Sequence, residues 1–81
     1  MSIEIRVDAI TDRLVDRLVG IGPARHLERR RMVQVETQTP SGMKLIISKE
    51  FPEAMALDDC VRQILEDEAR KRQQLAEARH G

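Results

Sequence analysis

The longest periodic stretch of this chain covers residues 52–78 and reads PEAMALDDCVRQILEDEARKRQQLAEA. In its first half, apolar residues recur at the three- and four-residue spacing of one helical face. These residues are Ala54, Leu57, Val61, Ile64 and Leu65, with Cys60 beside them. From residue 66 onward the only large apolar side chain is Leu75. The stretch therefore predicts one long helix whose first half lies on a core and whose second half projects from it.

Charge along the same stretch also favours a helix. Acids lie early and bases lie late, which complements the helix dipole. Four acid-before-base pairs at i to i+4 spacing each contribute roughly 0.2–0.5 kcal/mol in an isolated helix. They are Asp58 with Arg62, Glu66 with Arg70, Asp67 with Lys71, and Glu68 with Arg72. We expect a compact domain over residues 1–66 and a projecting charged helical arm or tail over residues 67–81, either ordered by a partner or frayed in solvent. A separate helix starting at Leu57 is the alternative to one continuous helix from Pro52.

Residues 32–49, before this stretch, have the pattern of a β-hairpin. Thr39-Pro40-Ser41-Gly42 is the turn, with proline at its second position and glycine where a left-handed residue is needed. The predicted register places Thr37 opposite Leu45, Val35 opposite Ile47, and Val33 opposite Lys49. Apolar residues then share one face and polar residues the other. Ile46 departs from this pattern, because it lies on the polar face opposite Glu36.

The first third of the chain changes its hydrophobic period. Residues 2–8 alternate apolar and polar side chains and predict a strand. Residues 9–20 place Ile10, Leu14, Val15, Leu18 and Val19 at helical spacing, and Gly20, Gly22 and Pro23 end that helix. Residues 23–31 predict a brief basic helix. The predicted fold is thus α+β, with element order β-α-β-β-α and a three-stranded, mainly antiparallel sheet.

Composition limits the classes of function. The 81 residues form one domain, and 14 acids balance 14 bases, so no overall charge attracts nucleic acid or an anionic membrane. One Phe, with no Trp or Tyr, provides no platform for base stacking. A single cysteine and the lack of an apolar leader or membrane-spanning run predict a bacterial-type cytoplasmic protein.

No motif for catalysis, metal binding or cofactor binding emerges. Cys60 lacks an obvious base, because the only histidines are His26 and the penultimate His80. The acids of the long helix match no Ca²⁺ loop, and Gly20-Ile21-Gly22 follows a predicted helix rather than a strand, so it is not a phosphate loop. We therefore expect no enzyme activity, no small-molecule substrate, no metal and no cofactor.

One segment concentrates positive charge. It contains Arg25, Arg29, Arg30 and Arg31. A basic patch beside a hairpin can hold a phosphate backbone, so the alternative function is a nucleic-acid-binding regulator. The other interpretation is a surface patch that pairs with acids of the same chain or of a partner.

The preferred hypothesis is a small non-enzymatic protein–protein interaction module. It would be an adaptor, inhibitor or assembly accessory protein, of the kind that phages and mobile elements encode. We expect it to act as a homodimer or bound to a larger protein, without membrane contact. The predicted contact residues are Ile46, Glu36, Arg70, Arg72 and Leu75.

Overall fold

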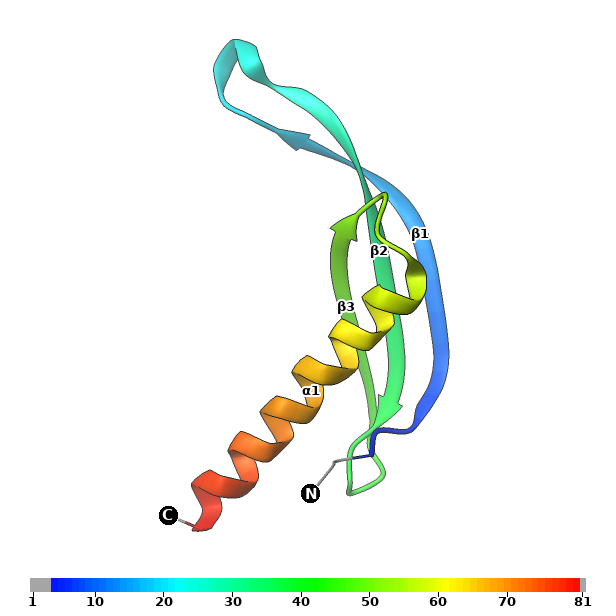
Figure 1. Ribbon diagram of the computed structural model, residues 1–81, viewed down its shortest axis with the longest axis vertical. Coiled ribbons are helices and arrows are strands. Elements are labelled where there is room, and N and C mark those ends of the chain that lie inside the picture. The colour runs from blue at the N-terminus through cyan, green and yellow to red at the C-terminus, as the bar shows by residue number, and fades with distance from the viewer. Residues whose placement is uncertain (1–3, 81) are drawn as a thin grey trace.

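The computed structural model describes residues 4–80, and the side chains of residues 4–78. It confirms an α+β fold: a three-stranded antiparallel sheet with strand order β1-β2-β3 and one C-terminal helix, α1 (Figure 1). The elements are β1 (Val7–Val19), a 3₁₀ turn η1 (Gly22–Ala24), β2 (His26–Gln38), β3 (Lys44–Pro52) and α1 (Leu57–His80). The predicted element order β-α-β-β-α is wrong, because the segment expected to form the first helix lies in β1.

The spacing of apolar residues in β1 explains this error. Ile10, Leu14 and Leu18 are four residues apart, which fits a helical face. Four is also a multiple of two, so the same residues share one face of a strand. Pairing with β2 decides between the two, because β1 pairs along its length from Val7 opposite Thr37 to Val19 opposite His26.

Two neighbouring predictions change for the same reason. Residues 23–31 form no helix beyond the single turn η1, and from His26 onward they belong to β2. The strand predicted over residues 2–8 begins only at Val7, and residues 1–3 lie outside the described part of the chain. β1 and β2 therefore form one long hairpin where the sequence predicts a short strand followed by two helices.

The β2–β3 hairpin has the register that the sequence predicts. Thr37 lies opposite Leu45, Val35 opposite Ile47, and Val33 opposite Lys49. At the turn, the Thr39 amide donates to the Met43 carbonyl over 2.8 Å, and Gly42 has a φ of 91°. A two-sided pattern and a short turn fix the register locally.

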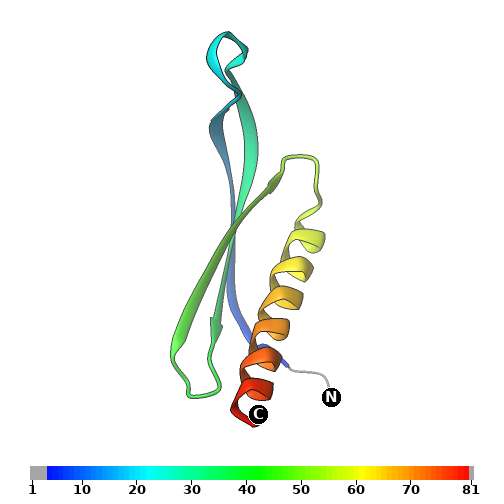
Figure 2. The same cartoon turned by 90° about the vertical axis from the view of Figure 1, so that its left-hand side faces the viewer.

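Helix α1 packs on β2 and β3 and leaves the opposite sheet face uncovered (Figure 2). It begins at Leu57, which matches the alternative start, because Pro52 still belongs to β3 and residues 53–56 form the connection. The core is small. Its buried side chains are those of Val33, Val35, Thr37, Phe51, Cys60 and Ile64. Cys60 is thus buried beside the apolar stripe of the helix.

The β1–β2 hairpin extends past the rest of the sheet. Pairing of β2 with β3 ends at Arg30 opposite Pro52, whereas β1 and β2 continue as a two-stranded ribbon to the turn at residues 20–25. We call residues 16–29 the β-arm; its tip is drawn in cyan in Figure 1. The β-arm gives the molecule its elongated shape, with extents of 52 × 29 × 20 Å.

Candidate functional site

Exposed apolar side chains gather on one face of the β1–β2 hairpin. Residues directly opposite each other in an antiparallel pair share a face, so Leu14 opposite Arg31 and Leu18 opposite Leu27 lie on the same side as the buried Val33. This is the side that α1 covers over β2 and β3. We name the exposed set on this face the apolar strip. It comprises Val7 (36% exposed), Ile10 (46%), Leu14 (49%), Leu18 (57%) and Leu27 (69%).

Ion pairs lie between the apolar residues of the strip. Arg31 Nε lies 3.2 Å from Asp12 Oδ1, and Arg29 Nε lies 3.6 Å from Asp16 Oδ1. Arg31 also donates from Nη1 to the Met55 carbonyl in the connection before α1. The charged residues of these pairs therefore have partners within the chain, while Arg29 and Asp16 stay 57% and 59% exposed beside the apolar residues.

The outer edge of β1 adds backbone groups to this surface. β1 is the first strand of the sheet, so one of its sides pairs with β2, and among residues 4–80 no strand lies beside the other. Edge strands are commonly protected by lysine, by proline or by shortness. The opposite edge, β3, has nine residues, carries Lys44 and Lys49, and ends at Pro52. β1 has 13 residues and contains neither lysine nor proline, so it presents the longer edge. Its five charged residues and the register irregularity between Val7 and Ala9 give it some protection of its own.

The tip of the β-arm presents a further apolar side chain. Ile21 is 89% exposed, and it lies between two glycines with positive φ, Gly20 at 98° and Gly22 at 58°. The turn is held by the Ala24 amide donating to the Ile21 carbonyl and the Arg25 amide donating to the Gly22 carbonyl, each over 3.2 Å.

The four arginines proposed for nucleic-acid binding do not form one patch. Because successive side chains of a strand point to opposite faces, Arg29 and Arg31 lie on the strip side and Arg30 on the other. Arg30 lies 3.6 Å from Glu28, and Arg25 follows the turn η1. Three of the four thus lie within 4 Å of a carboxylate, as the surface-patch interpretation expected, while nucleic-acid binding stays a prediction.

The residues proposed for partner binding lie on two separate faces. Ile46 and Glu36 oppose each other on the face away from α1, where Ile46 is 54% exposed and Glu36 lies 3.8 Å from Lys44. Arg70, Arg72 and Leu75 lie on the second half of α1. Arg70 reaches Asp67 over 3.7 Å, and Leu75 is 64% exposed. No single partner surface includes all of them, and their role stays a prediction.

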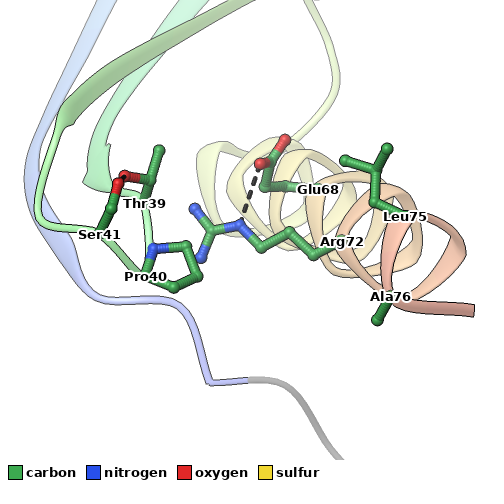
Figure 3. A pocket seen from close by; sticks show the side chains of 7 residues that line it. All are labelled: Thr39, Pro40, Ser41, Glu68, Arg72, Leu75 and Ala76. Carbon is green, nitrogen blue, oxygen red and sulfur yellow. Dashed lines mark hydrogen bonds and ion pairs between the residues drawn. The ribbon is translucent and has the colours of Figure 1, made fainter. Parts of the chain in front are cut away.

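A hollow of about 470 Å³ lies between the β2–β3 turn and the second half of α1 (Figure 3). Its charged residues already have partners: Arg72 donates to Glu68 over 3.1 Å and to the Gln38 carbonyl over 3.0 Å, and both side chains are only 13% exposed. Figure 3 shows Arg72 pointing toward Pro40 of the turn. This arrangement ties the helix to the hairpin and leaves the hollow without an unpaired charge to hold a ligand.

A second tie between α1 and the sheet involves Asp67. Lys49 of β3 donates to the Asp67 carboxylate. That hydrogen bond holds the pKa of Asp67 below its ordinary value of 3.8, with smaller contributions from the charges of Lys49, Arg70 and Lys71. Residues on both sides of the predicted boundary at 66/67 thus contact the sheet.

Two further kinds of site were sought in the described residues. No three His, Cys, Asp or Glu side chains within residues 4–78 are grouped as a metal ion would require. No helix in the described part of the chain combines the length and apolar character needed to cross a membrane. Comparison of the chain with family models, with curated proteins and with solved structures found no match. The apolar strip is therefore the candidate functional site.

The apolar strip is not among the sites that the sequence predicts. The spacing of Ile10, Leu14 and Leu18 predicts a helix face, not the face of a strand. A fully alternating interpretation, with Asp12 and Asp16 between these residues, would have placed them on one strand face. That alternation was the available signal.

Proposed function

We propose that this chain is a small protein–protein interaction module, and that its contact surface is the apolar strip with the adjoining edge of β1. The observation that carries the proposal is the exposure of the strip. Large apolar side chains line one continuous face of β1, while the core of the domain holds only a few. Exposed apolar patches of this kind mark protein–protein contact sites.

The energetics support contact with a protein. Full burial of a Leu, Ile or Val side chain contributes about 1.5–3 kcal/mol. Leu14, Leu18 and Leu27 are 49–69% exposed, so a large share of that free energy is still available to a partner. An unpaired strand edge can add backbone hydrogen bonds to the same contact.

The charges of this face favour a protein partner over nucleic acid. Arg29 and Arg31 lie beside Asp16 and Asp12, so a phosphate group would have to displace carboxylates from both. The buried thiol of Cys60 fits a reducing cytoplasm. In that setting, an adaptor, inhibitor or assembly accessory role suits a chain of this size.

Two matched substitutions test the proposal. Leu18 and Ile46 have nearly equal exposure, 57% and 54%, but lie on opposite faces of the sheet. Tagged wild-type protein, Leu18→Asp and Ile46→Asp would be incubated in nuclease-treated extract of the native host, and the recovered proteins identified by mass spectrometry. We expect Leu18→Asp to lose the partner and Ile46→Asp to keep it. The same result is expected if the partner is an untagged copy of the chain added to the extract.

Three outcomes would contradict the proposal. Equal recovery with Leu18→Asp and wild type would remove the strip from the contact. Loss of the partner with Ile46→Asp alone would show that the contact lies on the opposite face of the sheet. Binding that disappears from wild type on nuclease treatment would point to nucleic acid instead. Circular dichroism of each variant checks that the fold is retained.

A further inference from the structure

The sequence along β1 is symmetric about Leu14 on the strip side of the sheet. Ile10 and Leu18 lie four residues before and after it, and Asp12 and Asp16 lie two residues before and after it. All five share one face, because they alternate along a single strand. An antiparallel copy of such a strand places like positions opposite each other.

We infer that the partner of β1 is a second copy of this chain, whose β1 pairs edge to edge and antiparallel about a two-fold axis at Leu14. This inference rests on the proposed function, since it names the occupant of the same surface. The pairing joins two sheets into one of six strands, β3-β2-β1-β1-β2-β3, with both helices on one face.

This register opposes apolar residues to apolar residues. Leu14 faces Leu14 of the second copy, and Ile10 faces Leu18 of the second copy. On the other face no like charges are opposed. There, Ala9 faces Val19, Thr11 faces Arg17, and Arg13 faces Val15. Cross-strand pairs of these kinds are the unit of sheet stabilisation.

The like-charge contact in this register is Asp12 opposite Asp16 of the second copy, and the two-fold axis repeats it. Each of these acids already has a basic neighbour in its own chain, Arg31 at 3.2 Å and Arg29 at 3.6 Å. The row across the interface is therefore Arg31, Asp12, Asp16 and Arg29, in which the two carboxylates are adjacent and each has a guanidinium on its other side.

Neighbouring registers fit less well. An axis at Arg13 opposes two copies of Arg13 and places Ile10 against Asp16. An axis at Val15 opposes Arg13 to Arg17 and places Leu14 against Asp16. An axis at Asp12 opposes two copies of Asp12. Of these registers, only the one at Leu14 opposes all three of Ile10, Leu14 and Leu18 to one another, so that register is favoured.

The β-arm supplies an independent reason for a neighbouring strand. Beyond Arg30 the sheet has only two strands, and a two-stranded hairpin alone is marginally stable in water. In the proposed dimer, the β-arm residues Asp16 to Val19 pair with residues 9–12 of the second copy. Each β-arm thereby gains a third strand, and the exposed sides of Leu14 and Leu18 are covered laterally.

Purified protein and single-cysteine insertions test this arrangement. Directly opposed residues of an antiparallel pair have Cα atoms about 4.5–5.5 Å apart, within the range that a disulfide spans. Under mild oxidation, Leu14→Cys should therefore form a disulfide-linked dimer, at least tenfold faster than Leu27→Cys. Leu27 is exposed on the same face but lies on β2, on the opposite side of the β-arm from the β1 edge that forms the proposed pairing. The native Cys60 is buried, so wild type gives the background.

A mixing experiment defines the register. Ile10→Cys and Leu18→Cys should each link slowly alone, because two copies of the same position are eight residues, or about 26 Å, out of register. A mixture of the two should link rapidly. Sedimentation of wild type should show a mass of two chains.

Other results would overturn the inference. A wild-type monomer at every concentration tested excludes the homodimer. If Leu18-dependent capture of a different protein persists in the extract, the proposed function stands and only the second copy is wrong. Equal linking of Leu14→Cys and Leu27→Cys would indicate face-to-face contact and would exclude edge pairing.

Discussion

Single residues join the helix to the sheet through polar contacts at the border of a small core. Lys49 bonds Asp67, and Arg72 bonds the Gln38 carbonyl, so both contacts cross from α1 to the hairpin. Hydrogen bonds to charged groups contribute more to the stability of the fold than hydrogen bonds between neutral groups. Solvent screens the interactions of a largely buried arginine less than those of an exposed one. The contacts of Asp67 and Arg72 explain why α1 stays on the sheet after its apolar stripe has ended.

The pKa of Asp67 tests the Lys49 contact directly. In the Lys49→Met variant, we expect NMR titration to show the Asp67 pKa raised toward 3.8, because the hydrogen bond that lowers it is lost. Arg70→Met should raise it less, since Arg70 acts only through its charge. A pKa unchanged by Lys49→Met would show that the two side chains do not interact in solution.

The same shift has a consequence for acid stability. A carboxyl whose pKa is lowered on folding stabilises the native state above its ordinary pKa. That contribution disappears as the pH falls through the folded value. The difference in unfolding free energy between wild type and Asp67→Asn should therefore be present at pH 7 and shrink only below pH 3.8.

At the scale of elements, the β-arm depends on its turn. Gly20 has a φ of 98°, and a Cβ at this position would lie 2.5 Å from the Ala24 carbonyl oxygen. Gly22 has a φ of 58°, but a Cβ there meets no atom within 4 Å. Both glycines have a left-handed backbone conformation, but only Gly20 is also close to another backbone atom. Substitutions at the two positions therefore distinguish the cost of the conformation from the cost of the close contact.

Replacing each glycine by alanine should affect the β-arm unequally. Gly22→Ala carries only the cost of a left-handed residue, about 1 kcal/mol. Gly20→Ala adds a backbone clash, so we expect a larger loss of about 2–3 kcal/mol. Hydrogen exchange of the amides in residues 16–29 measures this, because local opening reports the stability of the β-arm separately from the core. Equal exchange in both variants would contradict the close contact at Gly20.

At the scale of the whole molecule, stability comes from few buried side chains. The core lies under the first half of α1, where Cys60 and Ile64 are nearly inaccessible, and the β-arm extends well beyond it. An elongated chain of this kind exposes more surface than a compact one of the same length. Binding to a partner would add the burial that the domain itself lacks.

Substitutions along α1 measure how unevenly stability is distributed. Ile64→Ala should lower the free energy of unfolding by about 2–5 kcal/mol, and Ile64→Val by about 0.5–1.5 kcal/mol, because both leave a cavity in the core. Leu75→Ala, at a side chain 64% exposed, should change it by no more than about 0.5 kcal/mol. Denaturant unfolding at one fixed chain concentration tests this. Comparable losses at positions 64 and 75 would show that the second half of α1 belongs to the core.

The sequence by itself determined the elements whose signals are local. The β2–β3 register follows from a short turn and a two-sided pattern, and the stripe that includes Cys60 and Ile64 defines the buried face of α1. These features need only neighbours within one element or across one tight turn, so periodicity is sufficient to predict them.

Only the tertiary structure decided the conformation of residues 9–31 and, with it, the candidate site. Ile10, Leu14 and Leu18 satisfy the period of a helix and that of a strand equally, so the local pattern leaves both open. The choice comes from pairing with β2, whose residues lie up to 30 positions away in the sequence. Once β1 is a strand, its apolar side chains lie on an exposed strand face, where the sequence predicts the face of a helix, and the arginines of β2 divide between two faces.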